Sequence, residues 1–140
     1  MRFLTLIDRI ATTFMKKGKR AEADRLVQSV VHSFKLSHGS NYQQVIEKAI
    51  KNLTPKISLR SRKKAGLSYK IPVAIPDRQA FSLALRWLYQ AVNSRPEPQL
   101  EVRLYRELLD ASNMKGEGVK KRELLHQTAI LNRGFVKFFR

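Results

Sequence analysis

The sequence has 140 residues, of which 43% are hydrophobic and 28% are charged. A chain of this length can bury roughly 70% of the surface that it exposes when unfolded, which excludes a mini-protein without a core of its own. Its 28 lysines and arginines outnumber its 11 acidic residues and give a formal charge of +17 at pH 7. This excess indicates a polyanionic partner, and the apolar content excludes a basic disordered tail. We therefore expect one folded, strongly cationic domain over residues 1–140.

The sequence motifs that mark common enzyme active sites are missing. There is no cysteine, and the three histidines form no close-spaced ligand pair. No glycine-rich phosphate loop, dinucleotide fingerprint or nucleophile elbow is present. Glu107 and Asp110 lie three residues apart, a spacing that we interpret as an ordinary exposed helix face and not as a catalytic pair. We expect no enzymatic activity, cofactor, metal or small-molecule substrate, and no membrane partner because the apolar runs are too short.

The spacing of apolar residues predicts three helices in the first part of the chain, over residues 2–17, 20–35 and 41–53. Gly18 stands where a helix-terminating glycine is expected, and Pro55 follows the third helix. Residues 1–17 also have some character of an organellar transit peptide, but Asp8 argues against that interpretation. We expect this segment to be part of the fold.

Residues 56–75 change from helical periodicity to strict alternation, with Leu59, Leu67, Tyr69 and Ile71 among the apolar positions. Alternation on both sides of a short turn predicts a β-hairpin. Pro72 cannot donate a hydrogen bond within a sheet, so we expect an isolated, projecting two-stranded ribbon.

Three more helices are predicted over residues 77–93, 99–114 and 119–139. The fold class is therefore mainly α, a single-domain bundle of about six helices with one protruding two-stranded β-ribbon between the third and fourth. The last helix begins with three cations, at the end where the helix dipole disfavours positive charge. A bound phosphate would relieve this conflict.

The positive charge concentrates in three clusters, for each of which a merely solvated surface is the competing interpretation. Residues 56–70 contain six cations and no acid, so the ribbon would repel itself unless an anion binds it. A second cluster lies at the bend between the first two helices, and the third begins the last helix. The candidate RNA-binding residues are Lys16, Lys17, Lys19, Arg20, Lys56, Arg60, Arg62, Lys63, Lys64, Lys70, Lys120, Lys121 and Arg122.

The aromatic residues and His126 favour structural roles. Trp87 and Tyr89 lie on or beside an apolar stripe and are expected to pack in the core. Tyr69 could stack on an exposed base or pack across the ribbon. His126 is expected to be structural or solvent-facing.

Five segments, in order, resemble the family of small-subunit ribosomal protein S-seven over about 125 residues. They are Met15-Lys16-Lys17-Gly18-Lys19-Arg20-Ala21; Asn52-Leu53-Thr54-Pro55 with Leu59-Arg60-Ser61-Arg62 and Tyr69-Lys70-Ile71-Pro72-Val73; Ala84-Leu85-Arg86-Trp87-Leu88; Glu107-Leu108-Leu109-Asp110-Ala111; and Gly118-Val119-Lys120-Lys121-Arg122-Glu123 with His126, Ala129, Asn132 and Phe135. The resemblance implies a helical bundle with one β-ribbon.

The same resemblance implies a structural role in the small ribosomal subunit. The family binds the 3′ major (head) domain of small-subunit rRNA, nucleates head assembly, and reaches with its ribbon towards the tRNA exit site and the mRNA path. Neighbouring ribosomal proteins of the head and platform would be further partners. By analogy, the cations of all three clusters would hold rRNA phosphates.

The sequence departs from bacterial members of that family in its ends and in the ribbon turn. It starts at Met1 directly in the predicted first helix, whereas bacterial members begin with a basic arm, and the turn reads Lys63-Lys64-Ala65-Gly66 where a Gly-Gly pair is common. We interpret these departures as those of a mitochondrial protein, with the bacterial cytoplasm or the plastid as alternatives.

Two other classes of function compete with a ribosomal one. A DNA-binding regulator would need base-reading side chains such as Asn or Gln on the ribbon, and residues 56–70 contain neither. An RNA-modifying enzyme would need a cofactor loop or an acid–base constellation.

Overall fold

The computed structural model describes residues 2–139. Its regular elements are helices, except for two consecutive strands in the middle of the chain. In chain order they are α1 (Phe3–Phe14), α2 (Arg20–His38), the 3-10 turn η1 (Gly39–Asn41), α3 (Tyr42–Leu53), β1 (Ile57–Lys64), β2 (Leu67–Ala74), α4 (Asp77–Ser94), α5 (Leu100–Ser112), α6 (Glu117–Asn132) and the 3-10 segment η2 (Arg133–Phe139). The mainly helical class, with one hairpin between the third and fourth helices, is confirmed.

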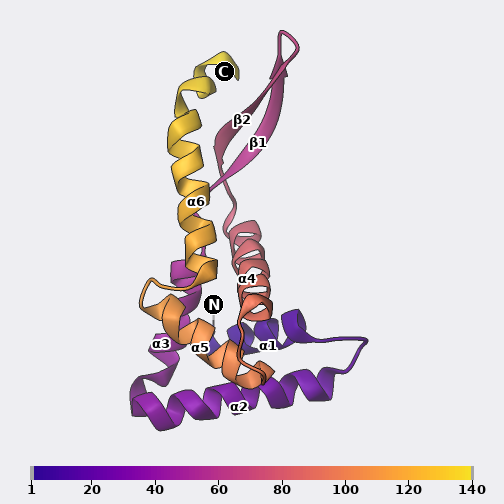
Figure 1. Cartoon of the computed structure of the whole chain (residues 1–140), viewed down its shortest axis with the longest axis vertical. Helices are drawn as coiled ribbons and strands as arrows, with labels where there is room; N and C mark the ends of the chain where they lie inside the picture. Colours follow the sequence, from indigo (N-terminus) through magenta and orange to yellow (C-terminus); the bar gives the residue numbers. More distant parts are fainter. Residues whose placement is uncertain (1, 140) are drawn as a thin grey trace.

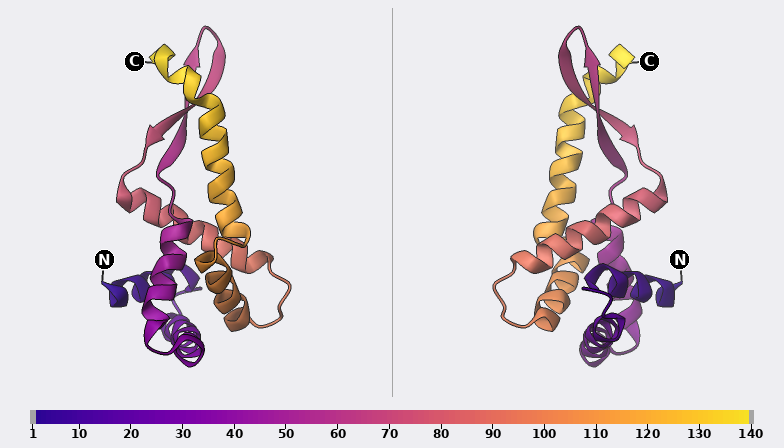
Figure 2. Two further views of the ribbon diagram at one scale, coloured as in Figure 1. Left: turned by 90° about the vertical axis from the view of Figure 1, so that its left-hand side faces the viewer. Right: turned by 90° about the vertical axis from the view of Figure 1, so that its right-hand side faces the viewer.

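The molecule is elongated, with a helical bundle at one end and the ribbon at the other (Figure 1). Helix α2 crosses the base of the bundle, and α4 rises from the bundle towards the ribbon. Helix α6 and the ribbon then extend side by side away from α1–α5, in both views of Figure 2. The long-range arrangement therefore places the ribbon tip and the α1–α2 connection far apart.

The bundle is held by an apolar core to which all six helices contribute. Its most deeply buried large side chains include Ile10, Phe34, Ile46, Leu88 and Leu104. Helix α4 contributes three buried alanines at positions 80, 84 and 91, whose small side chains let neighbouring helices approach closely. None of the described helices has the length and apolar content needed to span a bilayer.

Helix boundaries differ most from expectation in the last helix. It was predicted over residues 119–139, but α6 begins at Glu117, and the chain continues as a 3-10 segment from Arg133. Gly116 has φ +96° and permits the turn that starts the helix. Gly134 is a poor helix former and coincides with the change to 3-10 structure. Val119 of α6 belongs to the core cluster, and Ala129 is also buried.

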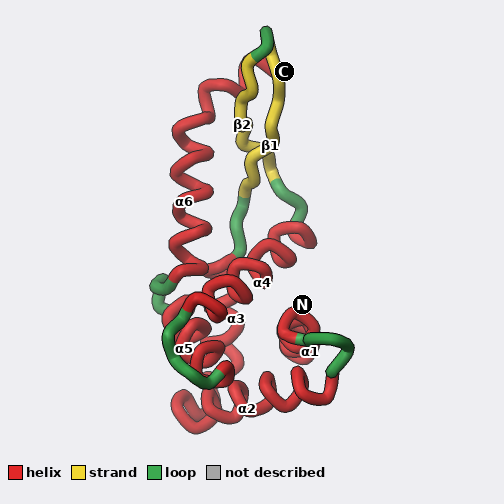
Figure 3. The backbone as a smooth tube through the Cα atoms, turned by 45° about the vertical axis from the view of Figure 1, so that its right-hand side comes forward, coloured by secondary structure: helices red, strands yellow, loops and turns green. Residues whose placement is uncertain are grey.

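The ribbon is a two-stranded antiparallel sheet, as expected, but it does not stand free of the rest of the molecule. Ile57 pairs with Ala74 at its base and Lys64 with Leu67 at its tip. The Tyr69 ring packs against Phe135 of η2, with ring centroids 4.9 Å apart. Figure 3 shows α6 following the yellow strands along their length. The prediction of an isolated two-stranded ribbon is confirmed, since the sheet has no third strand among the described residues. The packing of the ribbon against α6 and η2 was not predicted.

The ribbon turn contains a strained alanine that gives a direct test of its geometry. Ala65 and Gly66 have φ +54° and +79°, as a two-residue hairpin turn of type I′ requires. An alanine there costs about 1 kcal/mol more than a glycine. We expect Ala65→Gly to slow hydrogen exchange of the amides near the tip. The matched change Ala74→Gly, at the other end of β2, should speed exchange, and faster exchange in Ala65→Gly would contradict the turn assignment.

Candidate nucleic-acid interface

Two adjoining hollows run along the exposed side of α4. One, of about 320 Å³, lies between α1 and α4, and the other, of about 550 Å³, lies along the N-terminal half of α4. Ser82 and Arg86 line both hollows, so the two are continuous. The remaining lining residues are mostly polar: Arg9, Thr12, Thr13, Leu85 and Tyr89 in the first, and Ile75, Arg78, Gln79 and Leu83 in the second.

Three arginines of these hollows, Arg9, Arg78 and Arg86, form what we call the arginine track. Each is exposed, and within residues 2–139 none makes an ion pair or a side-chain hydrogen bond. Guanidinium groups beside hydroxyls, in an open groove, suit phosphate oxygens, because arginine presents a planar set of donors. The track is therefore a surface that can bind a polyanion along its length.

Sequence reasoning missed the arginine track as a site. The available signal was the spacing of Arg78, Ser82 and Arg86 at i, i+4 and i+8, which places them on one face of a helix. Arg9 could not have been assigned to this surface in advance, since its proximity to α4 depends on the packing of α1.

The cluster at the α1–α2 bend adjoins one end of the track. Lys16, Lys17 and Lys19 are exposed on a tight turn in which Lys17 has φ +53°. Arg20 differs from them, because its guanidinium binds the carboxylates of Asp8 and, at 2.9 Å, Asp24. These hydrogen bonds raise the pKa of Arg20, and the one to Asp24 has the largest effect. Arg20 therefore ties α1 to α2, and the three lysines carry the open positive charge of this bend.

Arg20 also connects the bend to the first hollow. Its Nη1 donates a hydrogen bond of 3.0 Å to the hydroxyl of Thr12, which lines that hollow. At the opposite end, Ile75 lines the second hollow directly after β2. The basic surface thus runs from the bend, along α1 and α4, to the base of the ribbon.

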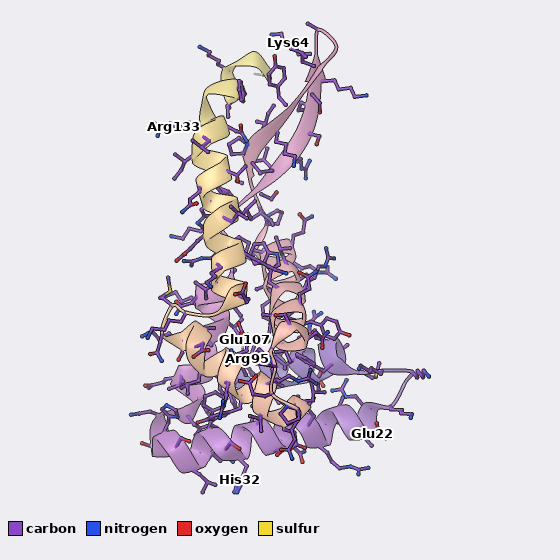
Figure 4. All side chains as sticks on the ribbon, viewed as in Figure 1. Glu22, His32, Lys64, Arg95, Glu107 and Arg133 are labelled. Atoms are coloured by element: carbon purple, nitrogen blue, oxygen red, sulfur yellow. The ribbon has the colours of Figure 1, made fainter. Side chains whose placement is uncertain are left out.

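The ribbon cations are all exposed and spread over both strands. Lys64 lies next to the tip, as labelled in Figure 4. The others of this cluster are Lys56, Arg60, Arg62, Lys63 and Lys70. No acidic residue lies between positions 56 and 70, so nothing on the ribbon itself neutralises them.

The interpretation of Glu107 as part of an exposed helix face was wrong. Its side chain is completely buried, and its Oε2 lies 2.9 Å from Nη1 of Arg95, which follows α4. The same Nη1 lies 2.9 Å from Asp110, and Glu97 is a further partner of Arg95. Burial disfavours the charged guanidinium, but hydrogen bonds to these carboxylates outweigh it and raise the pKa of Arg95. Figure 4 labels Arg95 and Glu107 side by side where α4, α5 and α6 meet.

Glu107 also changes the argument about the start of α6. Its Oε1 accepts a hydrogen bond of 3.3 Å from the backbone N–H of Gly118 in the first turn. A Cβ at Gly116 would come within 2.7 Å of the same oxygen. The carboxylate thus supplies the negative charge that the helix dipole favours. The helix dipole therefore has a negative partner within the protein, and phosphate binding at the third cluster stays a prediction.

The three cations of that cluster have different surroundings. Lys120 is largely exposed and lies 3.2 Å from Glu117. Lys121 donates a hydrogen bond to Oε1 of Gln90, on α4. Gln90 lies one helical turn after Arg86, so the third cluster adjoins the arginine track from the α6 side. Arg122 is half-buried, and its Nε has no hydrogen-bond partner among the described residues.

Tyr89 and His126 make structural contacts, as expected. Tyr89 packs against Phe14, with ring centroids 5.5 Å apart. Trp87 is half-buried. His126 accepts a hydrogen bond of 3.4 Å at Nε2 from the backbone N–H of Lys56, which joins α6 to the start of the ribbon. Burial, with the charges of Arg122 and Lys56, lowers the pKa of His126.

This lowered pKa predicts an acid-sensitive junction between α6 and the ribbon. The unfolded chain takes up the His126 proton at a higher pH, about 6.5, than the folded chain does. Stability should therefore fall as the pH drops from about 6.5 through the lower folded pKa. We expect His126→Gln to lose that part of the pH dependence in thermal melts between pH 7.5 and 5. The matched variant His32→Gln, on the exposed side of α2, should keep it. Parallel pH profiles for wild type and His126→Gln would contradict the assignment.

Taken together, these residues form a basic surface around α4 and the ribbon. The arginine track and the start of α6 both lie against α4, and the bend, which projects to the side of the bundle, reaches the track through the hydrogen bond from Arg20 to Thr12. The ribbon tip extends away from all three. No group of three or more potential metal-ligating side chains occurs among residues 2–139.

Comparison with known proteins identifies the family. The model of the family "Ribosomal protein S7p/S5e" matches residues 3–133. A relative from Streptococcus mutans, named small ribosomal subunit protein uS7, is 37% identical over 133 residues, which are 95% of this chain and 85% of the relative. Proteins of the same name from Trichormus variabilis and Rubrobacter xylanophilus are 35% and 34% identical over equal shares of both chains. This chain belongs to the ribosomal protein S7p/S5e family.

Proposed function

We propose that this chain is a structural constituent of the small ribosomal subunit that binds the 3′ major domain of its rRNA. Its family consists of ribosomal proteins and not of enzymes. The observation that carries the proposal is the continuous basic surface from the α1–α2 bend, through the arginine track, to the ribbon. Backbone phosphates are the ligand that such a surface suits, because it offers cations and hydroxyls but few base-reading groups.

In this proposal the protein helps to nucleate assembly of the subunit head. The bundle would hold rRNA along α1 and α4, while the ribbon would extend to the tRNA exit site and the mRNA path. Neighbouring ribosomal proteins of the head and platform are the expected protein partners. The ribbon supports this division of roles, since its cations are exposed and it projects beyond the bundle.

The mitochondrion is our proposed location. The relatives named above are bacterial and give this proposal no support, so the bacterial cytoplasm is the alternative. Fractionation of the source cells, followed by detection of the chain in mitochondria or cytosol, separates the two.

Binding to separate rRNA fragments tests the main proposal. We expect tight binding to a transcript of the 3′ major domain and much weaker binding to a 5′-domain transcript and to duplex DNA. The logarithm of the affinity should fall with the logarithm of salt by roughly 0.7–0.9 per phosphate contact. Equal affinity for all three nucleic acids, or a flat salt dependence, would overturn the proposal.

Crosslinking tests the position of the ribbon. A photoreactive amino acid at Leu67, which is 60% exposed beside the ribbon turn, should crosslink to tRNA or mRNA in assembled ribosomes. The same label at Leu36, which is 75% exposed on α2, is the control. Equal tRNA and mRNA crosslinks from both positions, or none from Leu67, would contradict the proposed location.

A further inference from the structure

The outward face of α6 carries a second kind of surface that the basic interface does not use. Leu124 and Leu131 are 64% and 82% exposed, although both are large and aliphatic. Leu124 and Leu131 are seven residues apart and therefore share one face of the helix. The opposite face holds the buried Val119 and Ala129. In Figures 1 and 3 no other element covers the side of α6 that faces away from the ribbon.

Thr128 completes an apolar seam on this face. It lies four residues after Leu124 and three before Leu131, the spacing with which helices pack along a heptad seam. Its hydroxyl donates a hydrogen bond of 2.9 Å to the backbone carbonyl of Leu124 and is thereby satisfied within the helix. We call Leu124, Thr128 and Leu131 the α6 seam. Its residues match the i, i+4, i+7 anchors of a helix that receives another helix.

The chemistry of the α6 seam favours protein over RNA. Phosphates are bound by cations and by polar donors, and between positions 124 and 131 there is no lysine or arginine. Contiguous exposed aliphatic side chains rimmed by polar residues mark protein interaction sites. The rim here includes Gln127, which is also exposed.

Charges at the two ends of the seam indicate which kind of protein segment would bind there. Lys120 lies one turn before Leu124 and stays 70% exposed beside its surface ion pair with Glu117. The exposed Arg133, labelled in Figure 4, lies two residues after Leu131. Glu123 is the only acidic residue within these bounds. A partner helix that crosses the seam is therefore best matched by an apolar stripe with acidic residues near both ends.

We propose that the α6 seam docks an amphipathic, acidic-flanked helix of a neighbouring protein in the small subunit. The proposal rests on the proposed place of this chain in that particle, but not on which rRNA it binds. A contact along two helical turns buries less surface area than a standard protein–protein interface does. It therefore acts as one of several contacts that hold the partner in the assembly.

Site-specific crosslinking in isolated small subunits tests the proposal. A photoreactive amino acid at Leu131 should give a crosslink to a protein, mapped by mass spectrometry to a helix with acidic residues beside an apolar stripe. Leu36, which is 75% exposed on α2, is the matched position for background. We expect at least a tenfold excess of that product from position 131 over position 36, and its loss in the additional variant Leu124→Gln. Crosslinks to rRNA, to a second copy of this chain, or at the background level would overturn the proposal.

A second measurement separates this proposal from the rRNA interface. The double variant Leu124→Gln/Leu131→Gln should keep the thermal melt and the affinity for the 3′ major domain transcript of the wild-type chain, because both side chains are exposed. Its yield of the protein crosslink from position 127, on the rim of the seam, should fall at least tenfold, whereas Leu4→Gln/Leu36→Gln should leave it unchanged. An unchanged yield in the seam variant would contradict docking. A chain absent from small subunits altogether would overturn the proposed function as well.

Discussion

Arg95→Met is expected to lower the free energy of unfolding by roughly 3–5 kcal/mol, the usual cost of leaving a buried charge without its partner. Glu107 is completely buried, and Arg95 is the cation that lies against it at 2.9 Å. Methionine keeps much of the volume of the arginine stem but removes every donor. Equilibrium denaturation of the purified protein measures the effect.

Arg106→Met is the matched control for this loss. Arg106 is 57% exposed and lies 3.4 Å from Glu97, so its removal should cost less than about 1 kcal/mol. The double variant Arg95→Met/Glu107→Gln should recover part of the loss. Glutamine is neutral, and its side-chain oxygen can still accept the hydrogen bond from Gly118. If Arg95→Met costs no more than Arg106→Met, the buried ion pair does not hold the meeting point of α4, α5 and α6.

The network around Arg95 shows what sequence reasoning could not supply. Glu107 and Asp110 are separated by an ordinary helical spacing, and nothing near them in the sequence indicates that one is buried and the other half-exposed. The difference arises because the chain after α4 returns over α5 and places Arg95 there. The close approach of Glu107 to Gly116 and Gly118 likewise depends on how α6 leaves the bundle. Contacts of this kind join residues far apart in the chain, so the local spacing of residues in the sequence does not reveal them.

The elements themselves were predictable, because their residues repeat with the period of the structure that they form. Helical spacing gave the six helices, and alternation gave a ribbon whose register runs from Ile57–Ala74 to Lys64–Leu67. The packing of the ribbon against η2 was not predicted, since the contact between Tyr69 and Phe135 joins residues far apart in the chain. For the candidate interface, charge runs indicated the bend and the ribbon. The arginine track lacks such a run, and only packing of α1 against α4 assembles it.

The arginine track yields the largest expected effect on rRNA binding. Replacing Arg9, Arg78 and Arg86 by Gln should weaken affinity for the 3′ major domain transcript and reduce the salt slope by about 2–3 units, near one for each lost phosphate contact. Thermal stability should change little, because these exposed side chains make no ion pair within residues 2–139.

A charge-matched variant decides whether the track itself binds or only the net charge of the chain matters. Arg25, Lys48 and Lys115 are also exposed, but they line neither of the two hollows along α4. Their replacement by Gln lowers the formal charge by the same amount, so a loss of long-range attraction alone would affect both triple variants equally. If the track forms the phosphate contacts, the salt slope should fall for Arg9/Arg78/Arg86 and stay close to that of the wild type for Arg25/Lys48/Lys115. Equal slopes in the two variants would show that the hollows along α4 are not the rRNA-binding surface.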